Sequence, residues 1–273
     1  MKKTDFDLHS MAQKILRSKK YRDTGLNPDT LMDLLQQEAA HQNSEKALQK
    51  SVRRKLHNIL APYLGEPDYE SFSKRLSEII NFGLESKQIR EFCLDILKEH
   101  ASTAERIDHQ TAFYQRLFEA TGQPASILDL ACGHHPFAFP WMGLSTSTAY
   151  HAYDILQPRV DLINQFFRVT GLEPLAENRD ILIHPPTIQA DLGIFFKEAH
   201  RFEKRQPGCN RSFWSALCVK TLAVSLPAHD LSGTHSLLER HRDLVYRNLP
   251  VDQPVQELVI NDEIIFLIDQ PGQ

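Results

Sequence analysis

The sequence predicts an α/β protein in which an all-helical N-terminal domain precedes a mostly parallel β-sheet flanked by helices. Two observations carry this prediction. Through the first hundred residues, apolar side chains recur at helical spacing. From about residue 105, short apolar runs alternate with helical segments, which is typical of a parallel α/β sheet. We therefore expect a helical domain over residues 1–104 and an α/β domain over residues 105–273.

Three segments of the N-terminal region predict amphipathic helices. The first begins at Asn27-Pro28, where a capping residue is followed by proline at the first helical position. The second lies near residues 46–63 and combines an apolar stripe with a dense basic flank. The third, near residues 89–97, repeats apolar residues on one face, which places Cys93 in the core.

The α/β elements follow in order. We expect strands at SILDLA, TAYHAYDI, DLGIFF and TLAVSLP, and a helix that starts near Pro158 and stops at Gly171. The final segment, VQELVINDEIIFLI, predicts two strands joined by a turn around Asn261-Asp262. A hairpin is thus expected to close the sheet.

The composition is that of a soluble globular protein, with 41% hydrophobic and 24% charged residues among 273. No apolar run approaches the roughly 20 residues that cross a bilayer, and the N-terminus lacks the apolar core of a signal peptide. We expect a cytoplasmic protein. Its four cysteines are irregularly spaced, which predicts reduced thiols and argues against a disulfide framework or a zinc site with paired cysteines.

The charge is distributed unevenly. Residues 1–65 hold 12 Lys and Arg against 7 Asp and Glu, whereas the remainder holds 19 against 28. A basic front end favours contact with a polyanion, because phosphate neutralisation supplies much of the affinity for nucleic acid. A solvated helical face is the alternative that the charges alone leave open.

A ligand site is expected where the first two strands end. Ligands of open α/β sheets bind beyond the carboxyl ends of the strands, so the segment Asp129–Gly133 and Asp154 belong to one crevice. Asp154 follows Gly133 by 21 residues, close to the offset at which an acid binds ribose hydroxyls. The full glycine fingerprint of a pyrophosphate site is missing, which favours S-adenosylmethionine, a nucleoside without phosphate. The alternative is a buried strand that ends in an ordinary turn.

His134 and His135 could indicate a metal site with Cys132. Adjacent side chains rarely converge on one ion, and no second cluster of ligands supports the site, so we expect no metal. Phe137, Phe139 and Trp141 are interpreted as core residues rather than as platforms for stacking bases. The sequence contains no G-x-S-x-G elbow of a serine hydrolase.

Motifs along nearly the whole chain resemble one known family. They are ILRSKKYRD, KSVRRKLHNILAPYL, HASTAERI, LDLACG, RDILIHPPTIQADLGIFFK, RFEKRQ, VSLPAHDLSG and NDEIIFLI. In this order they resemble the Arm/Rmt family of aminoglycoside-resistance 16S rRNA (guanine(1405)-N(7))-methyltransferases. The resemblance implies a Rossmann-like class I methyltransferase with a mixed, mostly parallel seven-stranded sheet. It further implies methyl transfer from S-adenosylmethionine to guanine N7 in the decoding site of the assembled 30S subunit, with aminoglycoside resistance as the result.

The resemblance also implies residue roles. Arg106, preceded by His100, Ala101 and Ser102, would hold the methionine carboxylate, a task suited to a guanidinium group. Asp154 would bind the ribose. The rest of the implied cofactor pocket consists of Tyr63, Ala131, Gly133, Asp180, Ile181, Phe196 and Gln206, of which Asp180 and Ile181 bracket the adenine. The residues expected to contact rRNA are Lys19, Lys20, Arg53, Arg54, Lys55 and His57.

The chemistry requires no visible catalytic base, because guanine N7 carries an exposed lone pair and transfer depends mostly on positioning. We expect the target-base region at His135, Leu226 and Pro227. The family commonly has Asn at the position of His135 and Phe at that of Leu226, and a more basic loop after Pro227. These departures leave two alternatives open, a methyltransferase of another rRNA guanine and a non-catalytic ribosome-binding relative. Nothing in the sequence indicates an obligate dimer, so a monomer is expected.

Overall fold

A seven-stranded sheet forms the centre of the molecule. The computed structural model describes residues 6–60, 67–80, 83–230 and 233–270. The strands have the order β3-β2-β1-β4-β5-β7-β6. Their bounds are β1 Ser126–Leu130, β2 Ala149–Asp154, β3 Ala176–Asn178, β4 Ala190–Phe196, β5 Val219–Pro227, β6 Val255–Ile260 and β7 Glu263–Asp269.

All neighbouring pairs among β1 to β5 are parallel, whereas β7 pairs antiparallel with both β5 and β6. This confirms the mixed, mostly parallel sheet and the C-terminal hairpin, whose turn lies at Asn261-Asp262. The strand β3 was not predicted, because three residues are too few to show a periodic pattern. With β1 and β4 side by side, the chain order reverses at β1, and a ligand crevice is expected beside the ends of β1, β2 and β4.

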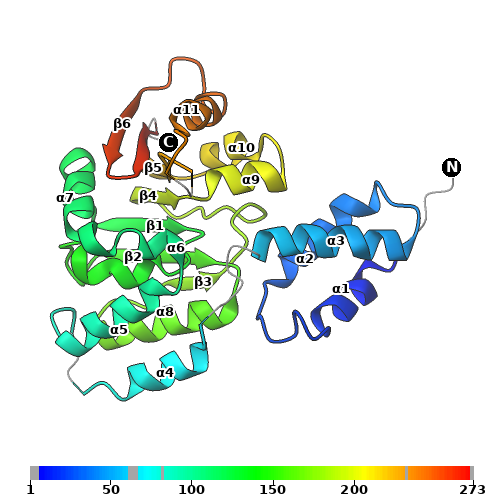
Figure 1. Cartoon of the computed structure of the whole chain (residues 1–273), viewed down its shortest axis with the longest axis horizontal. Helices are drawn as coiled ribbons and strands as arrows, with labels where there is room; N and C mark the ends of the chain where they lie inside the picture. The colour runs from blue at the N-terminus through cyan, green and yellow to red at the C-terminus, as the bar shows by residue number, and fades with distance from the viewer. Residues whose placement is uncertain (1–5, 61–66, 81–82, 231–232, 271–273) are drawn as a thin grey trace.

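Helices cover both faces of the sheet (Figure 1). One face packs against α7 Gln110–Thr121 and α8 Gln157–Thr170, together with the 3₁₀ segment η3 His135–Trp141. The other packs against α9 Ala199–Arg205, α10 Cys209–Ser215 and α11 Leu238–Tyr246. The helix predicted to stop at Gly171 does so, because Gly171 caps α8 in the left-handed conformation.

The aromatic residues after the first strand lie in the core, as expected. Phe137 and Phe139 are fully buried, and the half-buried Trp141 packs against the same cluster. Pro140 lies inside η3 and is incompatible with an α-helix there, since proline cannot donate a backbone hydrogen bond.

The first three helices form a lobe with its own hydrophobic core. These are α1 Leu8–Leu16, α2 Pro28–Ala39 and α3 Glu45–Leu60. Asn27 caps α2 by accepting a hydrogen bond from the amide of Asp29, which confirms the predicted helix start. Figure 1 shows this lobe to one side of the α/β body. The fully buried side chains of its core include Ile15, Leu31, Leu34, Leu35, Leu48, Val52 and Leu56.

The next helices pack on the sheet instead. They are α4 Tyr69–Ser77, α5 Lys87–Lys98 and the short α6 Ala101–Ala104, followed by the 3₁₀ turn η2 Ile107–His109. Phe72 and Phe92 belong to the same core cluster as α7 and α8, and so does Cys93, which is fully buried as predicted. The hydrophobic cores therefore divide near residue 60, while the boundary at residue 104 separates helices from α/β elements and stays a prediction.

The lobe joins the body at the end of β2. The amide of Asn27 donates to the carbonyl of Ile155 at 2.7 Å, and the amide of Gln157 donates to the carbonyl of Gly25 at 2.9 Å. Gly25 has a φ of +59°, and a Cβ there would lie 2.4 Å from Pro158, so only glycine fits this junction. In the part of the chain described here, no helix is long and apolar enough to span a bilayer.

Candidate functional site

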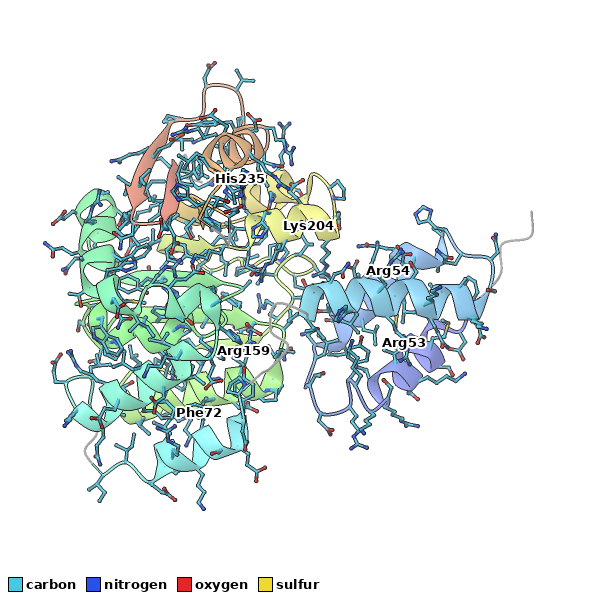
Figure 2. The ribbon with its side chains drawn as sticks, viewed as in Figure 1. Arg53, Arg54, Phe72, Arg159, Lys204 and His235 are labelled. Atoms are coloured by element: carbon cyan, nitrogen blue, oxygen red, sulfur yellow. The ribbon has the colours of Figure 1, made fainter. Side chains whose placement is uncertain are left out.

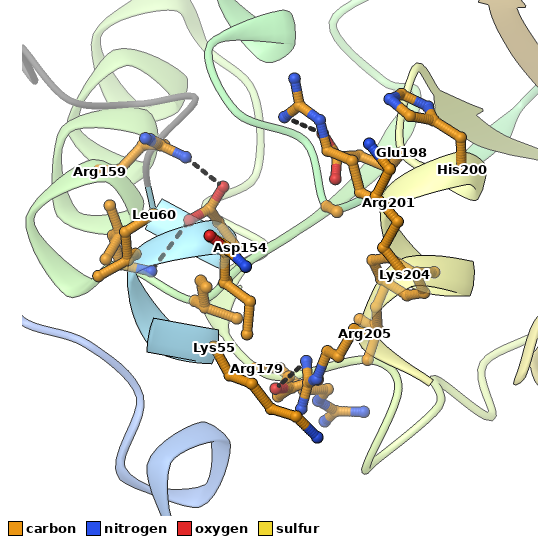
Figure 3. Close-up of a pocket in the computed structure, with 18 residues that line it drawn as sticks. Lys55, Leu60, Asp154, Arg159, Arg179, Glu198, His200, Arg201, Lys204 and Arg205 are labelled. Carbon is orange, nitrogen blue, oxygen red and sulfur yellow. Dashed lines mark hydrogen bonds and ion pairs between the residues drawn. The ribbon is translucent and has the colours of Figure 1, made fainter. Parts of the chain in front are cut away.

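Two cavities open at the carboxyl ends of the parallel strands. The larger has a volume of about 590 Å³ and lies between α3 and α9, above the end of β2 (Figure 3). The smaller, about 20 Å³, lies beside β1 and β4. Both are lined by Ala131 and Glu198, so the two spaces adjoin at the end of β1. The two spaces differ in their linings, since the smaller is bordered by Arg106 and the larger includes Asp154 and Ile181.

Asp154 holds the two strand ends together. Its carboxylate accepts hydrogen bonds from the amide of Gly133 at 3.1 Å and from that of Leu156 at 2.9 Å. Gly133 and Asp154, which were expected in one crevice, are therefore in contact, but Asp154 lines the larger cavity and Gly133 the smaller one. The same carboxylate pairs with Arg159 of α8 at 2.7 Å, and both side chains are buried. No pattern in the sequence had indicated a role for Arg159.

The backbone after β1 turns sharply beside this carboxylate. Ala131 has a φ of 54° and Gly133 a φ of 55°, and the amide of Cys132 donates to the carbonyl of Tyr153 on β2. A left-handed conformation at Ala131 is unusual for a residue with a Cβ, and such residues are concentrated where a binding site requires the strain. Ala131 of this turn lines both cavities, and Cys132 and Gly133 line the smaller one.

Asp180 connects the larger cavity to the N-terminal lobe. It is buried, and its carboxylate accepts from the hydroxyl of Thr30 at 2.7 Å and pairs with Arg205 of α9 at 2.7 Å. Ile181 is buried next to it and lines the same cavity. An apolar wall with a neighbouring carboxylate suits a nucleobase, as the resemblance implies for this pair.

Arg106 lines the smaller cavity and is held from behind by Glu263. Its Nε and one terminal nitrogen each lie 2.6 Å from a carboxylate oxygen of Glu263, at the start of β7. Burial alone would raise the pKa of Glu263, but the Arg106 charge and its hydrogen bonds lower this pKa to about 2. The guanidinium also lies 4.6 Å from the ring centre of Phe196. Glu263 thus fixes the direction of the guanidinium.

A second buried cation completes this charge cluster. Lys197 follows β4, has a φ of 60°, and pairs with Glu105 and, at 3.3 Å, with Glu263. Its ammonium group also donates to the carbonyl of Ser102. The smaller cavity is therefore bordered by two positive groups, Arg106 and Lys197. Both are held in position by ion pairs with neighbouring carboxylates.

The two adjacent histidines have different surroundings. His134 bonds through Nε2 to the hydroxyl of Tyr69 at 3.1 Å and stacks on His100 with ring centres 3.8 Å apart. Burial, with the nearby charge of Arg159, lowers the pKa of His134 well below its ordinary value. His135 instead contacts Asp129, Nδ1 to carboxylate, at 2.8 Å. Within the described ranges, no group of three or more potential ligands could hold a metal ion.

The expected cofactor residues divide between the cavities. Ala131, Asp154, Asp180 and Ile181 line the larger one, and Ser102, Arg106, Ala131, Gly133 and Phe196 line the smaller one. His100, Ala101 and Gln206 line neither cavity, although His100 supports His134 from the side. Gln206 is exposed and accepts a hydrogen bond from Gln37 at 3.4 Å. Tyr63 lies outside the described residues.

The three residues expected around the target base have different surroundings. His135 is 3% exposed and borders the smaller cavity rather than the surface. Leu226 is fully buried in the core beneath α9 to α11, and Pro227 is half-buried with its carbonyl bonded to His241 at 2.9 Å. Leu226 in this conformation offers no surface on which a base could stack. His135, Leu226 and Pro227 therefore do not form one exposed site for the target base.

The residues expected to bind rRNA all belong to the N-terminal lobe. Lys19, Lys20 and Arg54 are exposed, while Arg53, Lys55 and His57 are partly buried. The ammonium group of Lys20 lies 3.1 Å from Nδ1 of His57, which joins the end of α1 to α3. Figure 2 shows Arg54 on α3 and Lys204 on the neighbouring α9. No role was predicted for the cations of this helix, from which His200, Arg201, Lys204 and Arg205 line the larger cavity that Lys55 also lines.

These residues fit S-adenosylmethionine. A carboxylate at the end of the second strand accepts from vicinal hydroxyls, and Ile181 offers an apolar wall to a base. The adjoining smaller cavity presents Arg106 to a carboxylate. The turn that follows β1 and borders the two cavities lacks the repeated glycines of a pyrophosphate loop.

Comparison with known proteins gives consistent matches. The family described as ribosomal RNA methyltransferase (FmrO) matches residues 17–244. A 16S rRNA (guanine(1405)-N(7))-methyltransferase of Serratia marcescens is 29% identical over 260 residues, which cover 94% of this chain and 96% of that protein.

Two solved structures share the fold over nearly the full chain. The structure of the 16S rRNA methylase RmtB is 26% identical, with a TM-score of 0.80, and the match covers 98% of this chain and 100% of that one. The crystal structure of the 16S rRNA methyltransferase RmtF in complex with S-adenosyl-L-homocysteine is 21% identical, with a TM-score of 0.78 and the same coverage. The predicted fold, including the helical N-terminal region, is confirmed.

Proposed function

This chain belongs to the FmrO family of ribosomal RNA methyltransferases, and from that premise we propose that it transfers a methyl group from S-adenosylmethionine to N7 of guanine 1405 in 16S rRNA. The observation that carries the proposal is the pair of adjoining cavities. One is lined by Asp154 and Ile181 and the other by Arg106, so the linings match the chemistry of a nucleoside and of an amino-acid carboxylate, respectively. The curated relative from Serratia marcescens supports the choice of base and position.

The residues of the chain perform a positioning task. When bound, S-adenosylmethionine supplies a methyl group on a sulfonium centre. Asp154 would accept hydrogen bonds from the ribose and Arg106 would face the carboxylate, while the turn at Ala131 and Gly133 would border the reacting end. Guanine N7 is unprotonated and carries a lone pair at neutral pH, so no side chain has to remove a proton before transfer. Catalysis then depends on alignment, for which effective molarities of about 10⁵ M and above are known.

The N-terminal lobe supplies the RNA contact. Lys19, Lys20 and Arg54 are exposed on one lobe, and Lys204 is exposed on α9 beside the larger cavity. Lys55 of the lobe and Lys204 of α9 both line the larger cavity, and cations beside such a site suit a folded RNA whose backbone passes over it. We propose the assembled 30S subunit as the substrate and a monomer as the acting form. A methylated N7 carries a positive charge and added bulk, so aminoglycoside binding at the decoding site should weaken.

The proposal is tested by methyl transfer from labelled S-adenosylmethionine to purified 30S subunits, with naked 16S rRNA in parallel. We expect label in the 30S subunit and little in naked rRNA. Label in neither, from a protein that binds S-adenosylhomocysteine, would contradict the enzymatic function and favour a ribosome-binding relative. A reaction with an excess of unlabelled S-adenosylhomocysteine serves as the control, since it competes for the cofactor site and leaves the protein itself unchanged.

A further inference from the structure

His135 is buried at the end of the site without a role in the chemistry described so far. Its Nδ1 lies 2.8 Å from the carboxylate of Asp129, and the hydroxyl of Tyr150 donates to the same carboxylate oxygen at 2.7 Å. All three side chains are at least nine-tenths buried. Because an ionised carboxylate only accepts hydrogen bonds, the proton of the ring lies on Nδ1.

The other ring nitrogen is unsatisfied. Among the described residues, Nε2 of His135 is buried and has no hydrogen-bond partner. With the proton on Nδ1, a neutral ring presents a lone pair at Nε2. Leaving a buried polar atom unpaired costs about 1–3 kcal/mol, so such an atom at the edge of a cavity indicates a ligand contact.

The cavity beside His135 has two chemically distinct sides. His135 and Asp129 line it together with Arg106 and Lys197. The two cations suit the carboxylate of an amino acid, whereas the Asp129–His135 pair is an acceptor. The methionine end of S-adenosylmethionine is a zwitterion, and its ammonium group is a donor only. Phe196, whose ring centre is 5.1 Å from that of His135, limits the direction in which the ring could turn.

We infer that Nε2 of His135 accepts a hydrogen bond from the α-ammonium group of S-adenosylmethionine, with Asp129 holding the ring in the accepting tautomer. This inference rests on the proposed function, since it deepens the description of the same cofactor site. It makes His135 a cofactor-positioning residue and moves it from the base-entry side, where the sequence analysis placed it, to the amino-acid end.

The inference is tested by calorimetric titration with three probes. S-Adenosylhomocysteine has the complete zwitterion, its deaminated analogue lacks only the amino group, and 5′-methylthioadenosine lacks the whole amino-acid end. The variant His135→Asn keeps an amide that can donate to Asp129 and has no group at the position of Nε2. His135→Gln is the complementary variant, because its amide can reach that position.

For His135→Asn we expect the affinity for S-adenosylhomocysteine to fall about tenfold or more, the scale of a hydrogen bond to a charged group. The affinities for the deaminated analogue and for 5′-methylthioadenosine should change less than twofold. His135→Gln should recover part of the loss. Reading the ratio of affinities within each variant removes differences in the fraction of folded protein.

Three results would overturn the inference. An equal loss for all three probes means that His135 only supports the fold. An equal loss for S-adenosylhomocysteine and its deaminated analogue, with 5′-methylthioadenosine unaffected, places the ring against the carboxylate instead. Unchanged binding of all probes leaves the ring without a cofactor contact. If the wild-type protein binds no S-adenosylhomocysteine at all, the proposed function itself fails, which is a separate and recognisable outcome.

Discussion

The hydroxyl of Thr30 donates a 2.7 Å hydrogen bond to the carboxylate of Asp180, although the two residues are 150 positions apart. Thr30 lies on α2 of the N-terminal lobe, and Asp180 borders the cavity that would receive the adenine. The same carboxylate oxygen pairs with Arg205 of α9. The lobe that carries the basic helix is therefore attached directly to the wall of the cofactor site.

Replacing Thr30 by valine should weaken this attachment. The change keeps the side-chain shape and removes one buried hydrogen bond, so we expect a loss of about 1–2 kcal/mol in the free energy of unfolding. The affinity for S-adenosylhomocysteine should fall as well, because Asp180 loses a fixed partner. Urea unfolding and calorimetry measure the two effects. Thr111→Val, at an exposed position of α7, is the control and should leave both values unchanged.

Arg159 should be essential for the fold around Asp154. Arg159→Met leaves the buried carboxylate of Asp154 without its cation, and breaking a buried pair costs about 3–5 kcal/mol. Arg168→Met, an exposed position of the same helix, provides the matched comparison and should cost less than 0.5 kcal/mol or so. Denaturant unfolding measures the free energy of unfolding of both variants. Equal stabilities would mean that solvent reaches Asp154 and replaces the lost cation.

Glu263 should make the stability depend on acid pH. Arg106 lowers the pKa of Glu263 from 4.5 to about 2 in the folded protein. A lowered pKa contributes stability that is present above the unfolded value and is lost as the pH falls toward the folded value. Glu263→Gln should therefore be about 3 kcal/mol less stable than wild type at pH 7, with the difference shrinking below pH 4.5.

Unfolding of the Glu263→Gln variant and the wild type between pH 7 and pH 3 measures that difference. The control is Glu239→Gln, which removes an exposed pair with Arg242 and should cost at most about 1 kcal/mol at any pH. A stability difference for Glu263→Gln that does not change with pH would show that Glu263 is not ionised against Arg106 in the folded state.

Arg54 should contribute to RNA binding without affecting the cofactor. Arg54→Ala removes one exposed cation from α3, so the slope of log affinity for the 30S subunit against log salt should fall by about 1. The affinity for S-adenosylhomocysteine should stay the same. Lys74→Ala changes an exposed cation of α4, which Figure 1 shows on the body away from α3, and should leave the slope unaltered. An unchanged slope for Arg54→Ala would contradict the proposed contact between this face of α3 and the RNA.

The larger features of the fold could be predicted because they depend on local patterns. Helical spacing and capping located α2 and α5, and apolar runs located most of the strands. Asp154 was found from its offset to Gly133, since that spacing follows from the βαβ geometry.

The rest depends on contacts between distant segments. Arg159 has the sequence pattern of an exposed helix residue, and its burial follows only from the position of Asp154 and Tyr69. The divergence of His134 and His135 likewise depends on partners from α4 and β1. The pairing of Arg106 with Glu263 joins residues 157 positions apart, and no local pattern reports it.

The most direct test of the central claim is to locate the methylated base in 30S subunits treated with this protein and S-adenosylmethionine. Borohydride and aniline treatment cleaves RNA at N7-methylguanine, and primer extension then gives the position. We predict a single new stop that reports guanine 1405, absent when S-adenosylmethionine is omitted. A stop at another guanine would contradict the assigned target, and cleavage nowhere despite transferred label would contradict methylation at N7.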